Sequence, residues 1–245
     1  MNNELTSATC RLCGRTTGKR QATNHLKSCW ERHAIAGPGK RAGRWFHLVV
    51  QARHAPDYWL HMQAPGHRAF GELDSVLRRL WLECCDHLSA FEFPVKQPPR
   101  PRGFPSDFGA MMAALNQGAA ELTPDDDETL MGETLESRLQ PGTAFSHQYD
   151  FGSTTHLELR VAGEHPAPAI KGEFKLLARN EPRVFACSVC GKPATQFCQE
   201  CADTGEADLC DGCARVHECG SDALVPLINS PRLGVCGYCG PSVEP

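Results

Sequence analysis

The stretch AFSHQYDFGSTTHLELRV, residues 144–161, decides the expected fold, because two runs with alternating apolar residues flank a turn that contains glycine. Alternation of this kind is the period of a β-strand that buries one face. The residues expected on the buried faces are Phe145, Tyr149 and Phe151 in the first strand and Leu157, Leu159 and Val161 in the second. The stretch therefore predicts an antiparallel hairpin.

The register of this hairpin follows from matching the two apolar faces. Pairing Tyr149 with Leu157 aligns them and leaves FGSTT as the connection. The same register places Asp150 opposite His156 on the other face. These two could act as an acid–base or metal pair, although a polar cross-strand contact is the commoner role of such residues.

Further elements of a sheet and a helix precede the hairpin. RWFHLVVQAR reads as a buried strand, YWLHMQA (58–64) alternates, and FEFPV is a further strand candidate. AFGELDSVLRRLWLEC, residues 69–84, has apolar residues at helical spacing. Its last residue, Cys84, reads as a core residue, and the adjacent Cys85 as incidental. We expect an α+β domain with a mostly antiparallel sheet and one amphipathic helix, flanked by two small zinc-binding modules.

The chain holds fourteen cysteines in 245 residues, which is far above chance. Its polar start, MNNELTSATC, does not resemble a secretory signal, and no stretch approaches the ~18 apolar residues of a membrane span. We therefore expect a cytoplasmic protein without a membrane partner, whose thiols bind metal rather than form disulfides.

The N-terminal cysteines have the spacing of a zinc site. CRLCGRTTGKRQATNHLKSC provides Cys10, Cys13, His25 and Cys29. Cys10 and Cys13 suit a knuckle that presents two thiolates, and residues four apart on a helix face the same way. The stretch resembles a zinc finger of the Cys-Cys-His-Cys type, which implies that these four residues are the ligands.

The C-terminal cysteines allow two pairings. In CSVCGKPATQFCQEC, residues 187–201, sequential pairing would close two Cys-x-x-Cys knuckles around one ion with only a seven-residue connection. Interleaved pairing uses the ~15–20-residue spacing that zinc sites favour. It gives one site from Cys187, Cys190, Cys210 and Cys213, and another from Cys198, Cys201, His217 and a fourth ligand. We favour the interleaved arrangement, which resembles cross-brace fingers of the MYND and B-box types.

The fourth ligand of the second C-terminal site is open between two cysteines. Cys219 is the first choice and Cys236 its rival, while Cys239 has no assigned role. Ligands are in surplus, and a catalytic zinc would keep a position open for water, so these sites read as closed and structural. The sequence predicts about three zinc ions per chain.

The charge is distributed unevenly along the chain. Residues 1–54 hold ten basic and two acidic residues, a balance of +8, and the rest hold fifteen and twenty-seven, a balance of −12. A basic N-terminal region of this kind, here called the basic head, indicates an anionic partner, of which nucleic acid is the first candidate. A solvated basic linker is an equal alternative. The candidate phosphate contacts are Arg15, Lys19, Arg20 and Lys27.

The central segment resembles a known family. WFHLVVQARHAPDYWLHMQAP, FGELDSVLRRLWLECCDHLSAFEF and YDFGSTTHLELRV are similar to the plasmid pRiA4b ORF-3-like family over residues 45–178. Family members often carry an acid where this chain has Ser153 and a tryptophan where it has Thr155. The resemblance implies a modular protein linked to mobile elements and names no activity.

The expected organisation is a finger (1–35), a basic linker (36–44), an α+β domain (45–180) and a double-zinc module (181–245). A proline-rich loop (94–105) interrupts the α+β domain. The favoured function is a non-enzymatic interaction protein that binds nucleic acid through its head and a protein through its C-terminal module. The alternative is a metal-dependent enzyme that uses Asp150 and His156 on the hairpin.

Overall fold

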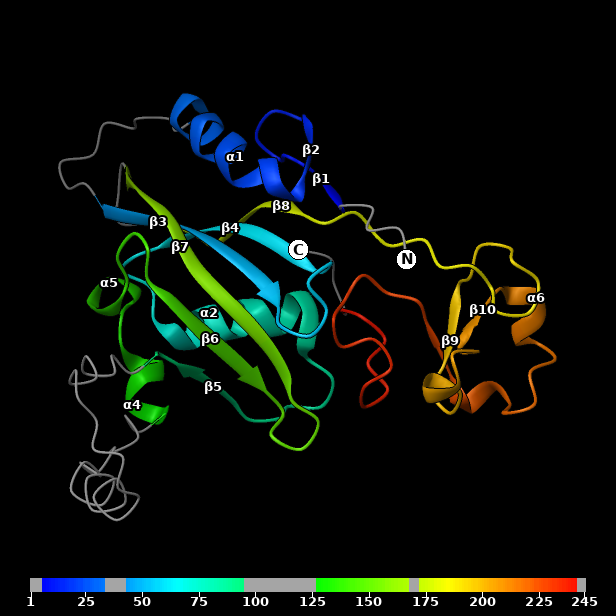
Figure 1. The fold of residues 1–245 in the computed structure, drawn as a ribbon. Helices are drawn as coiled ribbons and strands as arrows, with labels where there is room; N and C mark the ends of the chain where they lie inside the picture. Colours follow the sequence, from blue (N-terminus) through cyan, green and yellow to red (C-terminus); the bar gives the residue numbers. More distant parts are fainter. Residues whose placement is uncertain (1–5, 34–42, 95–126, 168–171, 242–245) are drawn as a thin grey trace, which may run out of the picture.

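The computed structural model describes residues 6–33, 43–94, 127–167 and 172–241, and its centre is a six-stranded sheet (Figure 1). The strands are β3 (Gly43–Ala52), β4 (Trp59–Pro65), β5 (Ser89–Glu92), β6 (Ala144–Tyr149), β7 (Thr155–Ala167) and β8 (Lys175–Arg179). They lie in the order β5-β6-β7-β3-β4-β8, and each neighbouring pair is antiparallel. Together with its helices this sheet makes the α+β fold that the sequence predicts.

One face of the sheet buries the main core. Alternate side chains of β3, β4 and β7 point to this face, as the apolar alternation of the β4 and β7 segments predicts, among them Leu48, Val50, Leu60, Met62, Leu157, Leu159 and Val161. Helix α2 (Phe70–Leu77) and the short π-helix η1 (Arg78–Leu82) cover them. The side chain of Glu72 accepts a hydrogen bond from the N–H of Ala69, which caps the start of α2. Two short helices, α4 (Asp127–Gly132) and α5 (Leu135–Arg138), add Leu130 and Leu135 to the core.

The hairpin of β6 and β7 forms in a different register from the predicted one. Tyr149 pairs with Thr155 rather than with Leu157, and Leu157 pairs with His147. Phe145 and Tyr149 are buried as expected, but Phe151 lies in the turn and is 54% exposed. The prediction failed because it counted Asp150 and Phe151 as strand residues, whereas the strand ends at Tyr149 and Asp150 adopts a left-handed conformation with φ 65°.

The opposite face of the sheet carries the N-terminal finger. It consists of β1 (Ser7–Thr9), β2 (Thr16–Gly18) and α1 (Lys19–His33) (Figure 1). Leu26 and Trp30 of α1 pack with Trp59 of β4 and with Leu177 of β8, in a second apolar cluster. The backbone N–H of Arg11 donates to the carbonyl of Leu177 (2.8 Å), so the finger is attached to the edge of the sheet.

The C-terminal module is a small three-stranded sheet beside the central domain (Figure 1). It holds β9 (Gln196–Cys198), β10 (Asp208–Leu209) and β11 (Leu224–Pro226), with η2 (Ala202–Thr204), α6 (Asp211–Ala214) and η3 (Ser221–Ala223) between them. After β11, residues 228–240, here called the return segment, pack against the central domain. Ser230 donates from Oγ to the carbonyl of Trp81 (2.6 Å), and Arg232 is fully buried.

Parts of two predicted segments lie outside the described residues, namely 36–42 of the basic linker and 95–105 of the proline-rich loop. Among the helices of the described ranges, none combines the length and the apolar character that a membrane crossing requires.

Candidate metal centres and a basic groove

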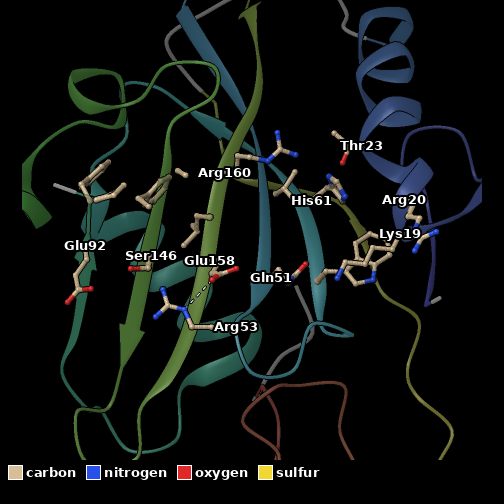
Figure 2. A pocket seen from close by; sticks show the side chains of 17 residues that line it. Lys19, Arg20, Thr23, Gln51, Arg53, His61, Glu92, Ser146, Glu158 and Arg160 are labelled. Atoms are coloured by element: carbon tan, nitrogen blue, oxygen red, sulfur yellow. Dashed lines mark hydrogen bonds and ion pairs between the residues drawn. The ribbon is translucent and has the colours of Figure 1, made fainter. Parts of the chain in front are cut away.

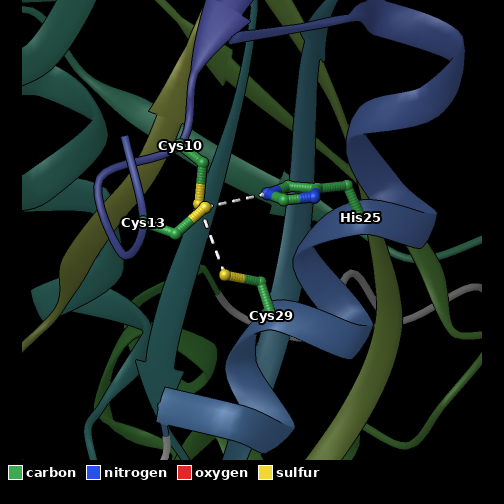
Figure 3. A group of neighbouring side chains, drawn as sticks. All are labelled: Cys10, Cys13, His25 and Cys29. Carbon is green, nitrogen blue, oxygen red and sulfur yellow. Dashed lines mark hydrogen bonds between the residues drawn. The ribbon is translucent and has the colours of Figure 1, made fainter. Parts of the chain in front are cut away.

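The four predicted residues of the finger lie around one point (Figure 3). Cys10 and Cys13 come from the loop after β1, where the N–H of Gly14 donates to the carbonyl of Cys10 (2.8 Å). His25 and Cys29 project from one side of α1. The sulfur atoms of Cys10 and Cys29 are 3.8 Å apart, and Cys13 Sγ is 3.4 Å from His25 Nε2. Zinc bonds of ~2.3 Å to sulfur and ~2.0 Å to nitrogen give tetrahedron edges of about 3.5–3.8 Å.

The electrostatics of this group favour a bound cation. Burial raises the pKa of the Cys29 thiol to about 12, and hydrogen bonds with Cys13 and Cys10 add to the effect. The backbone of Arg15 lowers the pKa of Cys13. Thiolates this close repel one another, which raises the pKa of each remaining thiol. A bound metal cation removes this repulsion, so the group is suited to a metal.

The two C-terminal groups are interleaved. The ligand atoms of Cys187, Cys190, Cys210 and Cys213 lie within 4.8 Å of one another, and so do those of Cys198, Cys201, His217 and Cys219. The sulfur atoms of Cys190 and Cys210 are 3.6 Å apart, and Cys201 Sγ is 3.7 Å from Cys219 Sγ. CSVCGKPATQFCQEC thus contributes one knuckle to each group, and β9 leads into the second knuckle, ending at Cys198.

Local backbone structure prepares these thiols for a cation. The N–H of Gly191, which has φ +72°, donates to the carbonyl of Cys187 (2.8 Å) and closes the first knuckle. The backbone of Cys210 is the largest of several causes that lower the pKa of Cys187 to about 6. Hydrogen bonds with the Cys190 and Cys210 side chains raise the pKa of Cys213 to about 12. The backbone thus favours the thiolate at Cys187, which is the form that binds metal, while the neighbouring thiols disfavour it at Cys213.

Cys236 does not complete the second C-terminal group, for which it was the rival candidate. Cys219 takes that place, and Cys236 lies in a fourth group with Cys84, Cys85 and His87. Cys239 is outside all four groups that the described residues form, and its Sγ donates to the carbonyl of Gly237 (3.0 Å).

The fourth group was missed by sequence reasoning, which gave Cys84 to the core, called Cys85 incidental and left His87 without a role. The described residues therefore contain four groups able to hold a metal ion, one more than the sequence predicts. The signal in the sequence was weak: two adjacent cysteines with a histidine two residues on, and a cysteine pair near the end of the chain without partners.

All fourteen cysteines lie within the described residues and are free thiols in this structure.

Asp150 and His156 do not form the pair that the enzyme alternative requires. His156 pairs with Gln148 across the hairpin, and its ring meets the edge of His54 at 5.7 Å between centroids. Asp150 turns away, and its Oδ2 accepts a hydrogen bond from Arg232 Nη2 (2.6 Å). That bond is the first cause that lowers the pKa of Asp150 to about 2. The carboxylate is thus an anchor for the return segment.

A groove of about 920 Å³ lies between the start of α1 and the face of the sheet that carries the finger (Figure 2). Lys19 and Arg20 enter it from the finger, and Arg53 and Arg160 from the sheet. Its acidic residues are Glu92 and Glu158, of which Glu158 pairs with Arg53 at 3.2 Å. Four basic and two acidic side chains leave the groove with a positive balance.

The four predicted phosphate contacts are not all in this groove. Lys19 and Arg20 line it, and the ammonium of Lys19 also donates to the carbonyl of Pro56. Burial is the first cause that lowers the pKa of Lys19. Arg15 lies on the knuckle loop, and Lys27 lies beside Gly163 of β7, and neither is among the residues that line the groove.

A buried histidine pair adjoins the groove. His47 Nε2 and His61 Nδ1 are 2.8 Å apart, and both rings lie between the sheet and α1. Burial is the largest cause that lowers the pKa of each ring to about 3, and for His47 the charge of His61 adds to it. Both rings are therefore neutral near pH 7.

The comparisons with known proteins give no name to this arrangement. No family model and no curated protein matches the chain. Among solved structures, it is similar to the crystal structure of a protein of unknown function, MM3350, from Methanosarcina mazei Go1. The identity is 14%, the match covers 57% of this chain and 70% of that chain, and the TM-score is 0.38. A likeness at this level carries no argument, so the resemblance to the pRiA4b ORF-3-like family stays a prediction.

Proposed function

We propose that the protein is a zinc-stabilised, non-enzymatic nucleic-acid-binding protein, and that the groove between α1 and the sheet holds the phosphate backbone. The single observation that carries this proposal is the convergence of basic side chains from two regions distant in sequence, Arg20 in the finger and Arg53 and Arg160 in the sheet.

Zinc is the metal that suits the donor sets. The finger and the two interleaved groups each offer thiolates and at most one imidazole, at separations that match the edges of a zinc tetrahedron. Soft sulfur ligands in tetrahedral array select zinc or iron–sulfur chemistry. Zinc also suits the small size of these modules, since a cluster of this length gains most of its folding free energy from its ion.

The groove suits a polyanion because its positive groups lie at both walls. Arg20 is exposed at the start of α1, Arg160 lies on β7, and Arg53 directly follows the end of the neighbouring strand β3. Guanidinium groups bind phosphate with two parallel hydrogen bonds, and such contacts fix the position of a backbone without reading its sequence. The proposal therefore expects binding with little sequence preference.

Fluorescence anisotropy would test the proposal with labelled single-stranded DNA, single-stranded RNA and duplex DNA of about 20 nucleotides, between about 50 and 200 mM salt. Neutralising the groove with Arg20→Gln, Arg53→Gln and Arg160→Gln together should weaken binding. It should also reduce the slope of log affinity against log salt by about 0.7–0.9 for each phosphate that the variant no longer neutralises. The three nucleic acids tell which form the groove prefers.

Arg215→Gln is the control for charge loss outside the groove, because it removes one positive charge from an exposed position on the C-terminal module, against three in the triple variant. Arg15→Gln separates the groove from the general basic surface of the finger, since Arg15 lies outside the groove. Zinc content should stay unchanged in every variant. Binding that ignores salt, or a triple variant that binds as tightly as Arg215→Gln, would refute the groove as the binding site.

A further inference from the structure

The fourth cysteine–histidine group joins two distant parts of the chain. Cys84, Cys85 and His87 follow η1 in the central domain, and Cys236 belongs to the return segment, 151 residues after Cys85. We propose that these four residues bind a zinc ion, and that this ion fastens the return segment to the central domain. The proposal does not depend on nucleic-acid binding or on the groove.

The separations support one shared ion. Cys85 Sγ is 3.7 Å from Cys84 Sγ, 3.5 Å from Cys236 Sγ and 3.0 Å from His87 Nε2. Cys236 Sγ is 3.5 Å from the same ring nitrogen. All of these separations exceed the ~2.05 Å of a disulfide, and three of the four match the ~3.5–3.8 Å edges of a zinc tetrahedron, the 3.0 Å from Cys85 to His87 being shorter. Three thiolates and one imidazole are also the donor set that favours zinc over oxygen-seeking cations.

Positive charge lies where the thiolates would form. The guanidinium of Arg232 is fully buried, and its Nη2 lies 3.5 Å from Cys84 Sγ. The same side chain contacts Asp150, Ser153 and Thr155, so its position is fixed by the hairpin turn. A fixed cation beside a thiol favours the thiolate, which is the form that binds metal. Arg232 thus belongs to the return segment and supports a ligand in the central domain.

The backbone at this junction adopts a costly conformation. Among the described residues, the non-glycine positions with positive φ are Asp86 (61°), Asp150 (65°) and Cys236 (53°). Asp86 lies between two ligands, Cys236 is a ligand, and Asp150 Oδ2 is 3.6 Å from His87 Nε2. A residue with a Cβ is strained in the left-handed conformation, and it keeps that conformation where the surrounding structure holds it there. An ion bound to both sides of the junction supplies that constraint.

Metal stoichiometry tests the site directly, by elemental analysis of the full-length purified protein. The native chain should hold four zinc ions, and Cys236→Ser or Cys85→Ser should hold three. Cys239→Ser is the matched control, because Cys239 belongs to the same Cys-x-x-Cys motif but lies outside the group, and it should keep four. Equal zinc content in the native chain and in Cys236→Ser would overturn the proposal.

A second measurement tests the fastening. Hydrogen exchange at the amides of Val235 and Tyr238, which donate to Arg232 and Val235 carbonyls at 3.0 and 3.1 Å, reports on the return segment. Exchange there should be faster in Cys236→Ser than in Cys239→Ser, while amides of β3 and β7 exchange equally slowly in both. Equal protection of the return segment in the two variants would show that no ion fastens it.

Thiol alkylation with mass spectrometry distinguishes a redox pair from a metal site. The proposal expects Cys85 and Cys236 to be protected in the native protein and to become alkylated after chelation without added reductant. A Cys85–Cys236 disulfide in protein purified without oxidant, which would release only after reduction, would overturn it.

Discussion

Arg232 and Asp150 form a buried ion pair, with 2.6 Å between Nη2 and Oδ2, although 82 residues separate them in the chain. The guanidinium also stacks over Tyr149 at 4.8 Å from the ring centroid. The hairpin that dominates the central fold is thus held by a residue from the far end of the chain.

Removal of this guanidinium should destabilise the whole protein. Arg232→Met would leave the Asp150 carboxylate without its partner at a site that water reaches poorly, which costs far more than loss of an exposed pair. Arg183→Met, which removes an exposed pair with Asp57, should change the free energy of unfolding by less than about 1 kcal/mol. Urea unfolding followed by circular dichroism compares the two. A smaller effect for Arg232→Met than for Arg183→Met would contradict the structure.

Asn180 should be one of the most sensitive polar positions. Its side chain accepts from the N–H of Trp59 (3.0 Å) and donates to Asn229 Oδ1 (2.8 Å), and the residue is 1% exposed. Asn180→Ala leaves these groups unsatisfied, and each buried unsatisfied group costs about 1–3 kcal/mol. Loss of about 2–4 kcal/mol in the free energy of unfolding, measured by urea denaturation, is expected. Asn24→Ala, at a site on α1 outside this network, should stay within about 0.5 kcal/mol.

The buried histidine pair should make stability depend on pH. His47 and His61 have pKa values of about 3 in the folded protein, below the usual ~6.5 of the unfolded chain. The unfolded state therefore binds more protons below about pH 6.5, so their contribution is complete above that pH and is lost as the pH falls towards 3. His61→Gln should show a shallower loss of unfolding free energy between about pH 7.5 and 5.5. Since both proteins keep the cysteine groups, the difference in slope isolates the histidines.

Removal of zinc by a chelator should unfold the finger and the C-terminal module before the central sheet domain. The finger and the C-terminal module have small apolar clusters, whereas the central core joins β3, β4, β7 and α2. Structural zinc typically contributes about 10–16 kcal/mol of binding free energy to small domains. Excess chelator should therefore speed hydrogen exchange in α1 and β9, with β3 and β7 still protected, and added zinc should restore protection. Unchanged exchange in α1 would show that the finger folds without metal.

Much of the central fold could be predicted, because a strand that buries one face shows alternating apolar and polar residues in the sequence. Leu60 and Met62 lie on the buried face as their spacing predicts, and Leu157 and Leu159 do the same. The turn between β6 and β7 was harder to predict. Its geometry depends on Asp150, whose Oδ1 accepts from the N–H groups of Gly152 and Ser153 and whose Oδ2 binds Arg232. Nothing near the turn in sequence reveals that distant partner.

The same division applies to the metal groups. Cys10, Cys13, His25 and Cys29 lie within twenty residues, so spacing alone indicates that they meet. Cys236 meets Cys85 only because the return segment crosses back to the central domain, whereas the sequence offered Cys236 as a rival of Cys219 in the C-terminal module. When the fold brings together residues that are far apart in the chain, no spacing pattern in the sequence indicates that they meet.

The five residues 177–181, around the end of β8, contact the finger, the neighbouring strand and the return segment. The carbonyl of Leu177 accepts from the N–H of Arg11, the N–H of Glu181 donates to the carbonyl of Ser7, and Asn180 joins Trp59 to Asn229. A slip of this strand by one residue would break its bonds to all three regions together. The three regions are consequently coupled mechanically through one short segment, so a displacement of any of them strains the attachment of the other two.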